Sequence, residues 1–91
     1  MEMQTTSIAA ISNVRRACFL PSDSGWLAPA PEEISIALER AGMTIDEFAK
    51  LMQIDNNYAR SWIDVGHKVP YAAWSVLCIC AGYGQIWRWV S

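Results

Sequence analysis

Side chains that form directed hydrogen bonds gather in one short stretch of this sequence, NNYARS at residues 56–61. Two asparagine amides, an arginine guanidinium and a serine hydroxyl occur there within six positions. These are groups that recognise the edges of nucleic-acid bases: Asn pairs bidentately with adenine, Arg with guanine, and Ser with either. The stretch therefore predicts a surface that reads base pairs, provided that it is held rigidly.

On a helix, with about 100° of rotation per residue, the polar and apolar residues of this region separate onto opposite sides. The polar side holds Asn56, Asn57, Arg60, Ser61 and Asp64. Ala59 and Trp62 fall on the other side, with Tyr58 at one edge. We expect Trp62 to be buried as the anchor of this helix and the polar side to face outward.

Capping signals predict four short helices that would position this surface. Their starts are marked by Pro31, Thr44, Asp55 and Pro70. Glu32 and Glu33 suit the positive end of the first helix, and Thr44 with Glu47 forms a capping box for the second. Gly42 and Gly66 predict the ends of the first and third helices.

The two ends of the chain carry different signals. The apolar run ACFL at 17–20 is compatible with a short strand, and the turn-forming residues of 21–31 indicate a linker. Alternation in IWRWV predicts a second strand at 86–90. Because that strand needs a partner for its backbone, we expect a homodimer interface formed by Ile86, Trp87, Arg88, Trp89 and Val90. The predicted domains are an arm and linker at 1–31 and a helical domain at 32–91.

Composition limits the classes of function. The chain has 91 residues, which indicates one domain, and 7 basic against 9 acidic residues, which gives no polybasic surface. Three cysteines and one histidine favour buried thiols in a reducing cytoplasm over disulfides or a zinc site. His67 has no placed nucleophile beside it, so we expect no enzyme and no cofactor, metal or small-molecule ligand.

Residues 69–87 carry no charge, and their number approaches the length of a membrane span. Pro70, Ser75, Gly82, Gly84 and Gln85 dilute the apolar character of the segment. Its strongly apolar part, 72–81, fits a buried helix better, with Trp74 in the core. A tail-anchored membrane protein is the weaker alternative.

The stretch MTIDEFAKLMQIDNNYARSWIDVG at 43–66 resembles the helix-turn-helix of the lambda-repressor and Cro-like superfamily. The likeness lies in Thr44, the small Ala49 where two helices would pack, Ile54 in the turn and Trp62. The following proline-led apolar helix is similar to the tail of small regulators of phages and conjugative elements. The resemblance covers about residues 32–84. It departs at Gln53, where the family usually has glycine, in the longer spacing after Trp62, and at Asp64.

This resemblance implies a mainly α, four- to five-helix DNA-binding domain, with the option of short terminal β-strands. It implies a repressor of a mobile genetic element that binds a palindromic operator on double-stranded DNA as a homodimer. The expected DNA contacts are Thr44, Asn56, Asn57, Tyr58, Arg60, Ser61, His67 and Lys68. For Arg60, an ion pair with Asp64 is the alternative role. The alternative function is a protein-interaction or inhibitor module that keeps the fold without binding DNA.

Overall fold

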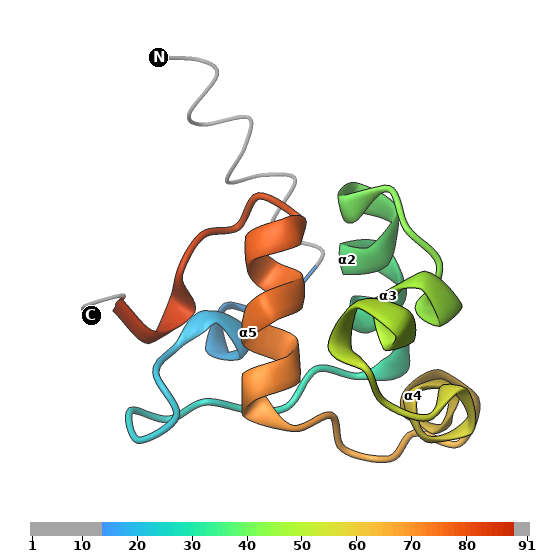
Figure 1. Ribbon diagram of the computed structural model, residues 1–91. Helices are drawn as coiled ribbons and strands as arrows, with labels where there is room; N and C mark the ends of the chain where they lie inside the picture. The colour runs from blue at the N-terminus through green and yellow to red at the C-terminus, as the bar shows by residue number, and fades with distance from the viewer. Residues whose placement is uncertain (1–13, 89–91) are drawn as a thin grey trace.

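The computed structural model describes residues 14–88, and over this part of the chain it consists of helices and turns (Figure 1). The α-helices are α2 (Pro31–Ala41), α3 (Ile45–Met52), α4 (Asn56–Asp64) and α5 (Tyr71–Cys80). Two 3-10 helices flank them, η1 (Arg16–Phe19) and η2 (Ile86–Arg88). The four predicted helices are confirmed, and each begins at or next to its expected start.

Local hydrogen bonds fix the ends of the first two α-helices. Gly42 ends α2 in the left-handed conformation with φ 71°, and its N–H donates to the carbonyl of Glu39 at 3.1 Å. Thr44 and Glu47 form the predicted capping box. The Thr44 Oγ1 accepts from the Glu47 N–H at 3.1 Å, and a Glu47 carboxylate oxygen accepts from the Thr44 N–H at 2.8 Å. Both reciprocal bonds satisfy backbone donors that the helix itself leaves open.

A short turn joins α3 to α4. Gln53 adopts the left-handed conformation, with φ 58° and ψ 46°, which is the conformation that glycine usually provides. The N–H of Ile54 donates back to the carbonyl of Ala49 at 3.0 Å. Asp55 then caps α4, because its carboxylate accepts from the Tyr58 N–H at 3.1 Å. The direction of α4 relative to α3 is thus set by these three turn residues.

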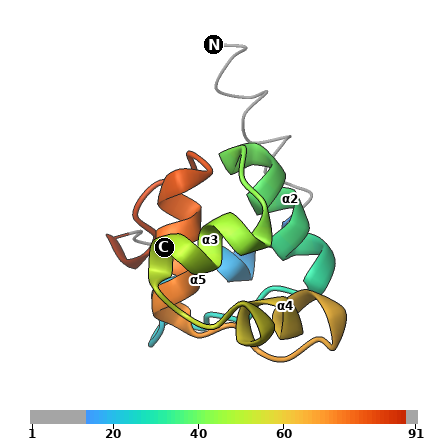
Figure 2. The same cartoon turned by 45° about the vertical axis from the view of Figure 1, so that its right-hand side comes forward.

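The four α-helices pack around one core. α4 lies across one end of the group, in contact with both α2 and α3, while α5 packs against α2 (Figures 1 and 2). The largest fully buried side chains include Trp62 of α4, Trp74 of α5 and Phe48 of α3. Burial of Trp62 and Trp74 confirms both predictions. Each indole removes a large apolar surface from water, which is the main stabilising term in a chain of this size.

The segment that precedes α2 is part of this core. Cys18 and Phe19 are buried, and the Cys18 carbonyl accepts hydrogen bonds from the indole nitrogens of Trp26 at 3.1 Å and Trp74 at 2.7 Å. The strand predicted for residues 17–20 is wrong, since residues 17–19 belong to η1 and Leu20 follows it. A short apolar run has no clear period, so the sequence alone could not distinguish a strand from a helical turn.

An ion pair between Arg15 and Glu33 connects the segment before α2 to the start of α2. Arg15 donates through Nε and Nη2 to the two carboxylate oxygens of Glu33, each at 2.9 Å. The backbone N–H groups of Arg15 and Ala30 donate to the same carboxylate at 2.8 and 2.6 Å. Glu33 is only 5% exposed, so these donors replace the water that it loses on folding.

The segment after α5 folds back onto the domain. Tyr83 stacks edge-on against Phe19, with ring centroids 4.8 Å apart, and the Arg40 guanidinium lies 4.9 Å from the Tyr83 ring. Ile86 is fully buried in η2. The predicted strand at 86–90 is therefore wrong over Ile86–Arg88, because Ile86 packs into its own domain. Trp89 and Val90 lie outside the described residues.

No helix within residues 14–88 is long and apolar enough to cross a membrane. The apolar segment 69–87 divides into the ten-residue helix α5, a turn and η2.

Candidate nucleic-acid interface

The polar side of α4 faces outward, as the sequence predicts. Asn56, Asn57, Arg60 and Asp64 are exposed, whereas Ala59 and Trp62 are buried. The Trp62 ring lies edge-on to Phe48, with centroids 6.4 Å apart, so α3 holds the inner side of α4. This packing fixes the rotation of α4 about its axis and thereby sets which side chains it presents.

Asn56 and Asn57 occupy the first two positions of α4. Among the described residues, neither amide has a hydrogen-bond partner. Each therefore presents its donor and its acceptor to solvent. An amide in this state can exchange its waters for the edge of a base, because Asn forms two hydrogen bonds with adenine.

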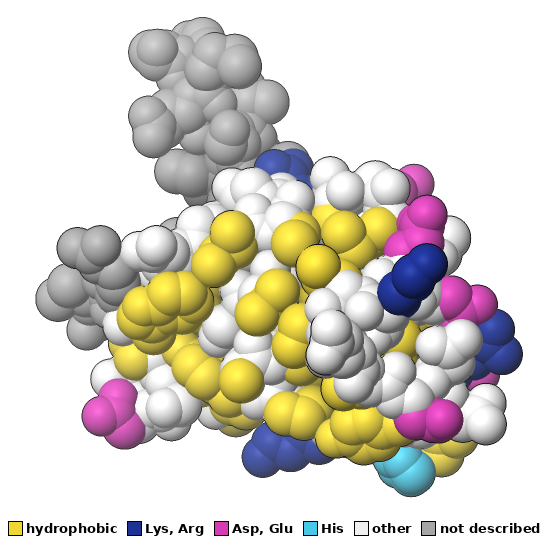
Figure 3. Space-filling model, viewed as in Figure 1, with side chains coloured by type: hydrophobic (Ala, Val, Ile, Leu, Met, Phe, Trp, Pro, Cys, Tyr) yellow, Lys and Arg dark blue, Asp and Glu magenta, His cyan; other side chains and the backbone are white. Residues whose placement is uncertain are grey.

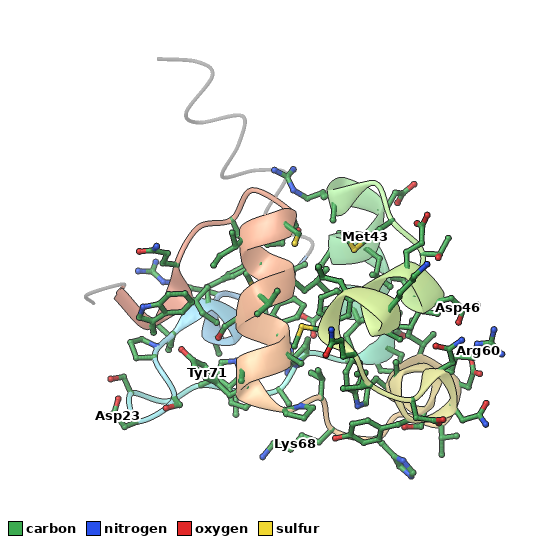
Figure 4. All side chains as sticks on the ribbon, in the orientation of Figure 1. Asp23, Met43, Asp46, Arg60, Lys68 and Tyr71 are labelled. Atoms are coloured by element: carbon green, nitrogen blue, oxygen red, sulfur yellow. The ribbon has the colours of Figure 1, made fainter. Side chains whose placement is uncertain are left out.

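Arg60 pairs with Asp46 at the start of α3. Its Nε donates to Oδ1 of Asp46 at 2.9 Å, and its Nη2 donates to Oδ2 at 2.6 Å. Figure 4 shows the two labelled side chains pointing toward each other from neighbouring helices. The hydrogen bond from Arg60 lowers the pKa of Asp46, so the carboxylate stays charged. The alternative role of Arg60, an ion pair with Asp64, is not seen, because Asp46 takes both donors on that edge of the guanidinium.

Tyr58 and Ser61 are partly engaged within α4. The Ser61 hydroxyl donates to the Tyr58 carbonyl at 2.5 Å, and the Ser61 side chain is half-buried. The Tyr58 ring lies edge-on to Trp62 at 5.3 Å and is 47% exposed. Ser61 consequently retains only acceptor capacity toward a ligand, whereas Tyr58 presents a ring edge and a hydroxyl.

The remaining site residues lie at the borders of this surface. Thr44 is exposed at the start of α3, where its hydroxyl oxygen already accepts the capping bond. His67 and Lys68 are exposed in the loop after α4. The Lys68 ammonium lies 5.7 Å from the centre of the Trp26 ring, so a cation–π contact steadies it. These residues lie at borders where phosphates would approach a bound helix.

The charges around α4 nearly balance. Asp55 and Glu47 cap helices, and Asp46 is neutralised by Arg60. Figure 3 shows basic and acidic side chains close together along the right-hand edge, where α3 and α4 lie. Asp64 is the exposed carboxylate at the end of α4. Within residues 14–88, no group of three or more His, Cys, Asp or Glu side chains could hold a metal ion.

The chain is 35% identical over 80 residues to a protein of Escherichia coli named transcriptional repressor protein KorC. That match covers 85% of this chain and 93% of the relative. The chain belongs to the KorC family. A second E. coli protein of the same name is 34% identical over 79 residues, with 84% of this chain and 92% of that protein covered. No protein-family model and no solved structure matches the chain, so KorC proteins provide the comparison.

One residue of this surface, Asp46, is not among the contacts that the sequence predicts. Its partner Arg60 lies 14 positions away on another helix. Spacing rules within one helix connect residues three or four apart, so no local signal could have revealed the pair. The KorC family relationship likewise comes from the comparison and not from the residue pattern.

Proposed function

We propose that this protein is a transcriptional repressor that binds double-stranded DNA in a sequence-specific manner, with α3 and α4 acting as a helix-turn-helix. The observation that carries the proposal is the outer side of α4, where the solvated amides of Asn56 and Asn57 stand beside Arg60 on a helix anchored by Trp62. Membership of the KorC family, whose named members are transcriptional repressors, supports the same function. Repression requires binding alone, so no catalytic group is needed.

In this proposal α4 enters the major groove. A helix fits that groove, and its first residues reach base edges while the neighbouring helix crosses the backbone. Asn56 and Asn57 lie at that leading end. Thr44, His67 and Lys68 contact phosphates, which positions the protein without specifying sequence. Occupation of a promoter in this way excludes RNA polymerase, and the setting is a mobile genetic element such as a plasmid or phage.

The repressor acts as a homodimer on a palindromic operator. Two copies related by a two-fold axis place their α4 helices about one DNA turn apart, roughly 34 Å. Since Ile86 is buried in its own domain, the interface proposed here lies instead on the outer side of α5. Ala72, Val76 and Ile79 form an apolar stripe there, and Ile79 is 46% exposed.

A second copy suits this stripe because two identical uncharged surfaces meet without like-charge repulsion. The chain carries no charge from 69 to 87, and Figure 3 shows hydrophobic side chains gathered over α5 with charged ones mainly at the margins. Trp87, also 46% exposed, extends the apolar surface available near the end of the chain.

Binding to duplex DNA tests the proposal directly. The operator is first located by footprinting upstream of the protein's own gene, and affinity is then measured at several salt concentrations. A repressor should lose affinity steeply as salt rises, because phosphate contacts release counterions. Asn56→Ala and Asn57→Ala should each weaken operator binding by about 1–3 kcal/mol, the value of one bidentate contact.

Both variants should keep the thermal stability of the parent, since the replaced side chains are solvated. Operator binding that is unchanged in both variants would refute the role assigned to α4. Absence of any duplex binding by the folded parent would instead favour a protein-interaction module. The near balance of charge around α4 is the observation that favours this second function.

A further inference from the structure

The guanidinium of Arg60 is used along one edge only. Asp46 accepts from Nε and from Nη2, so two of the five N–H groups are engaged. The remaining donors are both hydrogens of Nη1 and the second hydrogen of Nη2. One hydrogen of each nitrogen forms the fork at the tip of the side chain, on a different edge from the one that Asp46 occupies. Such a pair of donors can bind guanine O6 and N7.

We propose that Asp46 is a positioning residue that holds Arg60 for the readout of one guanine in the operator. This inference rests on the proposed function and deepens it, since it assigns a base and a second residue to the site. The pair leaves the guanine-binding fork open while it restrains the rotation of the side chain. Arg60 is thereby held in one orientation for base recognition.

Restraint matters because a long side chain loses rotamer freedom when it binds. Arginine is among the side chains with the largest entropy to lose, and a contact that fixes it beforehand lowers that cost. Arg60 is about half exposed, so the packing of the domain alone does not fix it. The two hydrogen bonds to Asp46 supply the missing constraint and also divert Arg60 from phosphates toward the bases.

Stability gives no adequate reason for this pair. Both side chains are close to half exposed, at 48% and 45%, and exposed ion pairs contribute little to folding. A carboxylate at a DNA-facing helix start also opposes phosphates, so its net effect on affinity for any sequence is unfavourable. A carboxylate in the first turn of α3 is favourable by itself, but it does not require a bidentate pair with Arg60, and a gain in base discrimination accounts for that pair.

The test measures the affinity of three variants, Asp46→Asn, Arg60→Ala and the double variant. Each is measured on the operator and on a set of operators in which every base pair is replaced, one at a time, by each of the other three. Arg60→Ala should abolish the preference for guanine at one position, a loss of about 5- to 150-fold in discrimination. Asp46→Asn should reduce the preference at the same position by at least about threefold. It should leave binding to unrelated duplex equal to or tighter than that of the parent.

The double variant should discriminate between operators as Arg60→Ala alone does, because Asp46 affects discrimination only through Arg60. Asp64→Asn is the matched control. It removes one exposed carboxylate from α4 without removing the ion pair, so it should change affinity for all sequences alike.

Three outcomes would overturn the inference. Asp46→Asn could tighten binding to every sequence equally, as is expected of Asp64→Asn. Asp46 would then only repel phosphates and would not position Arg60. It could weaken all sequences equally with a lower melting temperature, which would make it a helix-start residue only. Arg60→Ala could leave every base preference intact. Failure of the parent to bind duplex DNA would refute the proposed function itself and is distinguishable from all three.

Discussion

The indole nitrogen of Trp74 lies 2.7 Å from the carbonyl oxygen of Cys18, which is 56 positions earlier in the chain. This buried hydrogen bond ties α5 to the segment before α2. The indole nitrogen of Trp62 is also buried, yet it has no hydrogen-bond partner among the described residues. Two tryptophans of equal burial therefore differ in whether their N–H group is satisfied.

Replacement of Trp74 or Trp62 by phenylalanine should change the free energy of unfolding by different amounts. Trp74→Phe should lower the free energy of unfolding by about 1 kcal/mol more than Trp62→Phe, because it removes a made hydrogen bond as well as volume. Trp62→Phe removes an unsatisfied donor, which offsets part of the lost packing. Urea denaturation of both variants measures the difference. The reverse order would show that the Trp62 N–H has a partner in solution.

Trp62→Ala should lower the free energy of unfolding by about 3–5 kcal/mol, because it removes a large buried side chain and leaves a cavity.

Acid should loosen the Glu33 ion pair. Burial by itself would raise the pKa of Glu33, but hydrogen bonds from the Arg15 side chain and from the Arg15 and Ala30 backbones outweigh it and lower the pKa. The folded-state pKa is thus below the unfolded value of about 4.3. The stabilisation is complete above that value and is lost as pH falls through the folded-state pKa.

Glu33→Gln should therefore destabilise the protein at pH 7 by about 2 kcal/mol and flatten the acid side of its stability profile. Melting temperatures measured from pH 7 to pH 3 provide the comparison. Glu32→Gln, at the exposed neighbouring position, is the control and should leave the profile close to that of the parent. A profile for Glu33→Gln as steep as the parent's would assign the acid sensitivity to another group.

The turn between α3 and α4 contains backbone strain at Gln53, and a glycine at this position should remove it. Gln53 has φ 58°, where a side chain costs about 1 kcal/mol relative to glycine. Gln53→Gly should raise the free energy of unfolding by about that amount, whereas Gln53→Ala should leave it nearly unchanged. Thermal denaturation tests both. Equal stability of all three proteins would show that the Gln53 side chain makes compensating contacts in solution.

Dimerisation through α5 can be tested with the chain's own thiols. Burial raises the pKa of the Cys18 thiol to about 11 and also raises that of the Cys78 thiol, whereas Cys80 is exposed on α5 beside Ile79. Cys80 alone should react with maleimide in the folded protein. Mild oxidation should then join two chains through Cys80 if α5 faces its copy.

Ile79→Asp should convert the dimer into a folded monomer with much weaker operator binding, because a charge would enter the apolar interface. Sedimentation velocity at micromolar concentration measures the change. Leu51→Asp, on the exposed side of α3, is the control and should remain dimeric. A parent that sediments as a monomer would contradict the proposed dimer. An Ile79→Asp variant that remains dimeric would show that the interface does not lie on α5.

Local signals were sufficient for the helices and for the orientation of α4. Thr44, Asp55 and Gly42 act through bonds to backbone atoms within a few positions, so sequence spacing reveals them. The separation of Asn56 from Trp62 follows from helical rotation alone. These features determine most of the candidate surface, and they were predicted correctly.

Contacts between distant residues could not be predicted in the same way. The pairs Arg15–Glu33 and Asp46–Arg60 each join separate parts of the chain, and no spacing rule links them. The segment 86–88 alternates like a strand, yet burial of Ile86 against the domain decides for a helical turn. Tertiary burial overrides a local pattern in so short a stretch.

The core extends from Val14 to Ile86, and both residues are almost completely buried. On the ribosome, a nascent chain that has not yet released Ile86 lacks a side chain against which the earlier helices pack. Trp74 must also emerge before the carbonyl of Cys18 gains its closest hydrogen bond. The domain therefore completes its folding only after Ile86 has left the ribosome, and a chain terminated before that residue lacks part of the core.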